Sequence, residues 1–258
     1  MKKNRLKEIW AAGDLVTLGW LHIPNSWSAE IMAHAGWDAV TVDMQHGLHN
    51  LETAVQLLQA ISTTTAVPLA RANWNEPGHI MRLLDSGAYG IICPMVNTQE
   101  ECEQFVGACR YPPAGYRSFG PTRPRISIGA TYGDHANTEV LTIAMVETKE
   151  AVENIEAITA VPGLDGIFVG SGDLRLSLTG SVKKGEQEHL FDQAIDKILR
   201  TCQQYKIQPG VWCANPTDAA TMQAKGYRFI ALSSDSLMLN SMAKAQAQAL
   251  NALKIQQQ

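Results

Sequence analysis

The sequence contains little cysteine, and its cysteines are not spaced as metal-binding or disulfide pairs. Its 258 residues include five cysteines, an odd number, with no C-x-x-C pair among them. We therefore expect structural thiols in a reducing compartment. None of the five has a histidine beside it in the sequence, which argues against a catalytic thiol.

An excess of one charge and long apolar runs are also missing. The formal net charge is -4, which gives no electrostatic reason to expect binding to nucleic acid or to an anionic membrane. No apolar run approaches the roughly 20 residues that a membrane-spanning helix needs. The basic residues at 1–7 precede a segment too short and polar for a secretory signal. The expected location is the cytoplasm.

Alternating strand-like and helix-like segments fill the chain. Short apolar runs predict strands at 15–23, 38–43, 67–71, 90–96, 140–147, 166–170, 209–213 and 228–232. Helical periodicity follows at 29–35, 51–60, 79–85, 151–158 and 190–205, and the chain ends in a long Ala/Gln-rich helix. Thr98 with Glu101, and Asn215 with Pro216, mark the beginnings of two further helices.

Eight such units in series predict an α/β fold, the closed parallel (β/α)8 or TIM barrel. The 258 residues match the roughly 250 of one such barrel, and no change of composition marks a second domain. A doubly wound sheet of similar size would give the same local patterns. Residues 110–138 are rich in Pro, Gly and Arg and long for a barrel loop, so they could form an active-site cover, a subunit contact or an irregular surface crossing.

Polar side chains stand where the predicted strands end. Asp43, Arg71 and Glu147 each close a strand, His46 lies three residues after Asp43, and Asp173 follows the sixth strand. Parallel sheets gather their chemistry at this end of the strands, so these residues predict one site. Glu147 and Asp173 offer the oxygen ligands that Mg²⁺ or Mn²⁺ prefers, and the fork of Arg71 suits a carboxylate or an enolate.

The spacing alone leaves structural roles open. Glu147 and Asp173 could cap a helix and a turn, and Arg71 could form an internal salt bridge. Asp43 and His46 form only a weak Asp-x-x-His motif, although such a pair can orient an imidazole for proton transfer. A Schiff-base mechanism would need a lysine at a strand end. Lys149 is the nearest candidate but begins a helix, so metal-based stabilisation of an enolate is favoured.

Read jointly, these motifs resemble the HpcH/HpaI family of metal-dependent class II pyruvate aldolases, similar to 4-hydroxy-2-oxoheptanedioate and 2-keto-3-deoxy sugar acid aldolases. The resemblance covers almost the whole chain. It is carried by residues 29–33, 36–38, 43–46, 84–88, 94–96, 110–115, 146–148, 161–166 and 170–174.

The resemblance implies one TIM-barrel domain over 1–258 that reversibly cleaves a 4-hydroxy-2-oxo acid to pyruvate and an aldehyde. It implies that Glu147 and Asp173 hold a divalent metal, which would be Mg²⁺, Mn²⁺ or Co²⁺. Arg71 would bind pyruvate and its enolate. Asp43 would orient His46, which would move protons through a water.

The family pattern also implies supporting residues and an assembly. Asp85 would support the Asp43–His46 pair, and its alternative is a role at a helix end. Independently of the resemblance, the small residues at 170–174, Gly172 among them, permit backbone N–H groups to approach a carboxylate bound beside Asp173, although they could also form a tight turn or a phosphate site. Trp212, near the end of the seventh predicted strand, is expected to shape the pocket for the aldehyde. A homo-oligomer, a hexamer or trimer of dimers, is expected, with the C-terminal helix at about 236–254 packing on a neighbouring subunit.

Two positions depart from the commonest family pattern. Gln45 stands where many members have Glu, and Met145 stands where many have Gln, which removes a hydrogen-bonding group beside the pyruvate site. Three other functions stay open: decarboxylation of oxaloacetate through the same enolate, a lyase acting on an acyl-CoA, for which the arginines at 110–125 are the support, and a non-catalytic barrel that binds a keto acid, for which Met145 is the best evidence.

Overall fold

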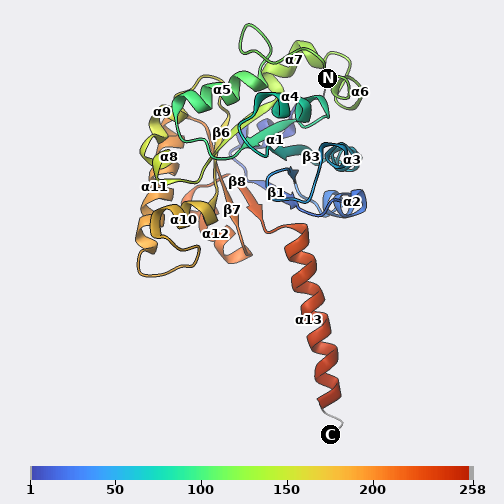
Figure 1. Cartoon of the computed structure of the whole chain (residues 1–258), viewed down its shortest axis with the longest axis vertical. Coiled ribbons are helices and arrows are strands. Elements are labelled where there is room, and N and C mark those ends of the chain that lie inside the picture. Colours follow the sequence, from blue (N-terminus) through green and yellow to red (C-terminus); the bar gives the residue numbers. More distant parts are fainter. Residues whose placement is uncertain (1, 256–258) are drawn as a thin grey trace.

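The strands form the closed barrel that the sequence predicts, in a computed structural model that describes residues 2–255. They are β1 (Val16–Leu21), β2 (Ala39–Asp43), β3 (Val67–Arg71), β4 (Gly90–Cys93), β5 (Leu141–Val146), β6 (Gly166–Val169), β7 (Gln208–Cys213) and β8 (Phe229–Leu232). Every neighbouring pair is parallel, and β8 pairs with β1 (Figure 1). This closure excludes the doubly wound alternative.

Helices surround the barrel on its outside (Figure 1). They are α1 (Arg5–Ala11), α2 (Ser26–His34), α3 (Leu51–Ile61), α4 (Pro77–Asp85), α5 (Gln99–Cys109), α6 (Pro124–Ser127), α7 (Tyr132–Glu139), α8 (Lys149–Glu153), α9 (Ile155–Thr159), α10 (Ser171–Thr179), α11 (Glu188–Tyr205), α12 (Pro216–Lys225) and α13 (Asp235–Ile255). Thr98 and Asn215 cap α5 and α12 as predicted. The helix predicted over 151–158 is instead two short helices, α8 and α9, which meet at Asn154, where the backbone leaves the helical conformation and the side-chain amide donates to the Asn97 carbonyl.

Two strands end earlier than the apolar runs suggest, and both ends matter for the site. β1 ends at Leu21, so His22 lies just beyond the strand. β4 ends at Cys93, and Met95 adopts a left-handed backbone conformation with φ of 55°. This turn directs the Met95 N–H toward the Glu147 carboxylate, 2.8 Å away.

Aromatic side chains pack across the inside of the barrel. The Trp20 ring stacks on Phe168 at 5.7 Å between centroids, and Phe168 meets Phe229 edge-on at 5.5 Å. Their strands, β1, β6 and β8, are not all neighbours, so these rings must point inward to touch. All three are buried. This layer closes the barrel beneath the site.

The segment 110–138 packs at the amino-terminal end of the strands, which does not fit an active-site cover. Arg110 donates to the Val140 carbonyl and pairs with Asp165, and these two residues directly precede β5 and β6. Arg117 is buried and pairs with Asp85 at the end of α4, 2.6 Å between Nη2 and Oδ1. The segment therefore lies opposite the carboxyl ends of the strands, where the chemistry is predicted.

The last helix extends away from the barrel (Figure 1), over the length that the sequence predicts. Its first turn lies against β1, and apolar side chains along it are exposed: Leu237, Leu239, Met242, Leu250 and Leu253. Among residues 2–255, no helix combines the length and apolar character that crossing a membrane requires.

All five cysteines are unpaired and buried, in agreement with the expected structural thiols. Burial raises the pKa of Cys102, Cys109, Cys202 and Cys213 to about 12, and it raises the pKa of Cys93 further. At neutral pH these thiols are protonated, so they are not nucleophiles.

Candidate active site

A small cavity at the carboxyl ends of the strands gathers most of the predicted site residues. Its volume is about 190 Å³. The predicted residues that line it are His46, Arg71, Glu147, Gly172, Asp173 and Trp212, and they come from β3, β7, α10 and the ends of β2 and β5. Trp20, His22, Met145, Gly170 and Ser171 complete the lining.

Glu147 is a buried carboxylate directly after β5. Burial raises its pKa to about 7, opposed by the hydrogen bond from Met95 and assisted by the negative charge of Asp173. Gly170 makes room for it, because a Cβ at that position would stand 2.3 Å from Glu147 Oε2. The sequence thus sets glycine beside the carboxylate so that backbone and carboxylate can approach closely.

Asp173 reaches the same cavity from the first turn of α10. Two carboxylates that line one small cavity repel each other, and burial makes the ionised form of Glu147 costly. A divalent cation would relieve both effects, so the pair fits a metal held through oxygen ligands. Among residues 2–255, no group of three or more His, Cys, Asp or Glu side chains could hold a metal. The remaining ligands would therefore be water and substrate oxygens.

Asp43 ends β2 and is fully buried beneath the cavity. Oδ1 accepts from Arg71 Nε at 2.8 Å and from the backbone N–H groups of Gln45 and His46. Oδ2 accepts from Arg71 Nη2 at 2.6 Å and Trp20 Nε1 at 3.0 Å, and it lies 2.9 Å from His22 Nε2. Burial opposes its ionisation, but the bonds from His22 and Arg71 outweigh burial and hold the pKa of Asp43 well below its usual range.

The predicted side-chain pair of Asp43 and His46 is therefore corrected. The hydrogen bond from His46 to Asp43 comes from the His46 backbone N–H and not from its ring. The side chains that contact the Asp43 oxygens are those of Arg71, Trp20 and His22. The His46 ring stands exposed at the rim of the cavity. Within the described chain, the imidazole that meets Asp43 belongs to His22.

Arg71 ends β3, opposite Asp43 in the sheet register. Its two bonds to Asp43 form the internal salt bridge that the sequence left open, yet the side chain also lines the cavity. Nη1 lies 3.8 Å from Met145 Sδ, a weak acceptor, and the guanidinium carbon lies 5.0 Å from the centre of the Trp20 ring. Arg71 is thus held rigidly while Nη1 keeps donor capacity for an anion.

The loop after β6 and the end of β7 form the opposite wall. Ser171 Oγ donates to the Trp212 carbonyl at 2.6 Å and joins the beginning of α10 to β7. Gly172 has no atom within 4 Å of a Cβ built on it, so space for a ligand remains there. Beyond Trp212 lies a second cavity of about 380 Å³. Ser171, Gly172 and Trp212 line both cavities.

Asp85 is not brought to this site within one chain. It ends α4 at the opposite end of the barrel, where it binds Arg117, and that partner lowers its pKa while burial, the larger effect, raises it. Sequence reasoning also missed Trp20 and His22. His22 carries nearly the same signal as Asp43, a polar side chain at the end of a strand, but the predicted first strand extended to residue 23.

Comparison with known proteins shows the family of this chain. Residues 17–241 match the profile of the HpcH/HpaI aldolase/citrate lyase family. The chain is 37% identical over 241 residues to the hydroxypyruvate/pyruvate aldolase of Rhizorhabdus wittichii, covering 93% of this chain and 96% of that protein. It is 34% identical over 257 residues to the 4-hydroxy-2-oxo-heptane-1,7-dioate aldolase of Salmonella dublin, covering 98% and 96%.

A solved structure gives the same result for the fold. A HpcH/HpaI aldolase/citrate lyase family protein from Burkholderia cenocepacia is similar with a TM-score of 0.86 and 28% sequence identity, covering 97% of this chain and 99% of that one. The profile match, the two relatives and this similarity all extend over most of the chain. The chain belongs to the HpcH/HpaI aldolase/citrate lyase family.

Proposed function

We propose that the protein cleaves a 4-hydroxy-2-oxo acid reversibly to pyruvate and an aldehyde, as a carbon–carbon lyase. The observation that carries this proposal is the convergence of Arg71, Glu147 and Asp173 on one small cavity. A guanidinium beside two carboxylates suits a substrate that carries a carboxylate and develops enolate charge. The names of the two aldolase relatives support the same reaction.

Glu147 and Asp173 are the residues that would hold a divalent metal, Mg²⁺, Mn²⁺ or Co²⁺. When bound, it would supply Lewis-acid polarisation of the 2-keto group. Arg71 would bind the pyruvate part of the substrate and stabilise negative charge as the enolate forms. Asp43 would keep the guanidinium in place through its two bonds.

The His46 ring at the rim would take the proton of the 4-hydroxyl group through a water. The C3–C4 bond then breaks, C4 becomes the aldehyde carbon, and the bonding electrons remain on C3 as the enolate. The proton taken from the 4-hydroxyl group would return through the same water to C3, which completes pyruvate. Gly172 and Trp212 would line the substrate, with Trp212 limiting the length of the aldehyde. In the direction of synthesis the same steps run in reverse.

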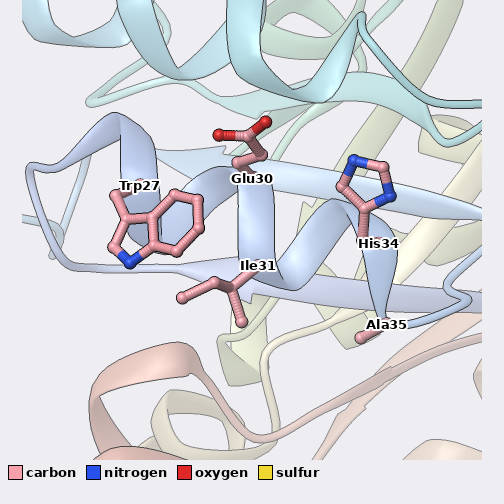
Figure 2. A pocket seen from close by; sticks show the side chains of 5 residues that line it. All are labelled: Trp27, Glu30, Ile31, His34 and Ala35. Atoms are coloured by element: carbon pink, nitrogen blue, oxygen red, sulfur yellow. The ribbon is translucent and has the colours of Figure 1, made fainter.

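We also propose a cytoplasmic homo-oligomer, a hexamer or trimer of dimers of single-domain chains. Unpaired thiols support the location, and the exposed apolar side chains of α13 support packing on a neighbour. On α2, Trp27 and Ile31 project from successive turns beside a surface hollow (Figure 2), and they are 66% and 54% exposed. A neighbour's α13 would cover this patch. Asp85 could act in the site of a neighbouring chain only in such an assembly.

The direct test is exchange of the C3 protons of pyruvate for deuterium in D2O, followed by NMR. This assay needs no knowledge of the aldehyde. Protein stripped with EDTA should be inactive, and Mg²⁺, Mn²⁺ or Co²⁺ should restore exchange in the wild type but not in Glu147→Ala. Folded protein that exchanges no proton with any of these metals would refute the proposal and favour a non-catalytic keto-acid-binding barrel.

A further inference from the structure

A second imidazole, that of His22, lies in the cavity wall and shares the Asp43 carboxylate with Arg71. Its side chain is 26% exposed, and its Nε2 lies 2.9 Å from Asp43 Oδ2. The same oxygen accepts from Arg71 Nη2. His22 is therefore linked through a single side chain, that of Asp43, to the Arg71 guanidinium that is proposed to bind the enolate.

The bonds of this ring determine which nitrogen carries a proton. Asp43 is ionised and can only accept, so His22 Nε2 must be protonated to bond with it. His22 Nδ1 lies 3.3 Å from Ser236 Oγ. In the neutral ring this nitrogen accepts from the serine hydroxyl. Both ring nitrogens are thus engaged by protein atoms.

The first turn of α13 also holds the backbone of His22. Asp235 accepts from the backbone N–H of His22 at 2.8 Å and from that of Ile23 at 3.2 Å. Its Oδ2 also accepts from Ser28 Oγ. Asp235 is 5% exposed, so these bonds are shielded from water. The ring and the backbone of His22 are therefore both fixed by residues more than 200 positions away in the sequence.

We propose that His22 is a positioning residue for Arg71, and that it ties Arg71 to the first turn of α13 through Ser236. This inference rests on the proposed function, because it assigns Arg71 to the enolate. His22 holds Asp43 Oδ2 in the direction in which that oxygen receives Arg71 Nη2. Without this bond Asp43 Oδ2 keeps only Trp20 and Arg71 as partners, so the position of the oxygen that receives Arg71 Nη2 is less closely fixed.

Two isosteric substitutions separate the two ring nitrogens. The amide nitrogen of His22→Gln reaches the place of Nε2, so it keeps the bond to Asp43 but cannot take up or release a proton. The amide of His22→Asn reaches only the place of Nδ1, so it keeps the contact with Ser236 and loses Asp43. His189→Gln is the matched control, because His189 is exposed on the surface and bonds only a backbone carbonyl.

The readouts are the kcat and KM of pyruvate C3 exchange with Mn²⁺, and the Kd of oxalate, a planar analogue of the enolate. His22→Asn should raise KM and Kd about tenfold, the scale of one lost hydrogen bond to a charged group. His189→Gln should stay within about threefold of the wild type, and His22→Gln, which keeps the bond to Asp43 but loses the Ser236 contact, should raise KM less than His22→Asn and to the same extent as Ser236→Ala. Ser236→Ala should raise KM in the same direction, and Ser241→Ala, in the same helix but bonded to the Met238 carbonyl, should not.

Three results would overturn the inference. An unchanged KM and Kd in His22→Asn would show that Asp43 and Arg71 need no support from His22. Loss of kcat in both His22 variants at unchanged KM would show that His22 itself carries the proton. An unchanged Ser236→Ala enzyme would remove the link to α13. If the wild type itself exchanges no proton, the proposed function fails instead, and the oxalate measurements alone still test the positioning of Arg71.

Discussion

Replacing Glu147 by glutamine should stabilise the metal-free protein while it abolishes activity. Glutamine has nearly the same shape and can still accept the Met95 N–H bond, but it has no charge to bury. The pKa of Glu147 is about 7 in the folded protein, against an ordinary value of 4.5. Between these two pH values the folded protein keeps a proton that the unfolded chain has lost. Its stability therefore falls as the pH rises through this window.

The magnitude follows from the width of the window. At about 1.4 kcal/mol for each pH unit, the ionised Glu147 lowers the free energy of unfolding by about 3 kcal/mol above pH 7. Glu147 is 2% exposed, so solvent screens this cost little. For a chain of this size, about 3 kcal/mol corresponds to roughly 6 to 12 °C in the melting temperature.

Thermal unfolding in EDTA at pH 4.5 and pH 8 measures the effect. Glu147→Gln should melt above the wild type at pH 8 and close to it at pH 4.5, where the wild-type carboxyl is neutral. Exposed Glu186→Gln is the control and should match the wild type at both pH values. Adding Mn²⁺ at pH 8 should reverse the order, because only the wild type offers both carboxylates. Equal melting of Glu147→Gln and wild type at pH 8 in EDTA would refute the burial argument.

Three further perturbations test the proposed site and assembly. Arg71→Ala should reduce kcat/KM for pyruvate exchange by a factor that corresponds to about 3 kcal/mol of activation free energy, the scale of a lost oxyanion donor. Full activity in this variant would refute the role of Arg71. Gly170→Ala should weaken Mn²⁺ binding in calorimetry, because the new Cβ would stand 2.3 Å from Glu147 Oε2, whereas Gly185→Ala, with no atom within 4 Å, should bind normally. A chain that ends at residue 238 should sediment as a smaller species than the full chain, and an unchanged sedimentation coefficient would contradict packing through α13.

The sequence was sufficient to predict the barrel and most of the polar residues at the carboxyl ends of its strands. The apolar runs before Asp43, Arg71 and Glu147 predict the ends of β2, β3 and β5 to within one residue, and in a parallel barrel these ends meet on one side, so the three residues could be placed together. The hydrogen-bond partners of these side chains could not be predicted from local sequence patterns. The ring that meets Asp43 is that of His22, which follows the neighbouring strand β1 and also contacts Ser236 of α13, a residue 214 positions away in the sequence.

Asp85 shows the same limit at the other end of the barrel. Its motif places it at the end of a helix, but its bond to Arg117 depends on the course of the irregular segment 110–138. That segment has little periodicity, so nothing local predicts which side of the barrel it covers. Its position became clear only through long-range contacts, such as that of Arg110 with Asp165.

The burial of every native thiol makes this protein a convenient background for site-specific labelling. With a pKa near 12, roughly one thiol in 100,000 is a thiolate at pH 7, so a maleimide would leave the native cysteines unmodified. A single cysteine introduced at the exposed position of Gln248 would then carry a spin label or a fluorophore without prior removal of the others. Distances between such probes on neighbouring chains would report how the long helices are arranged in solution.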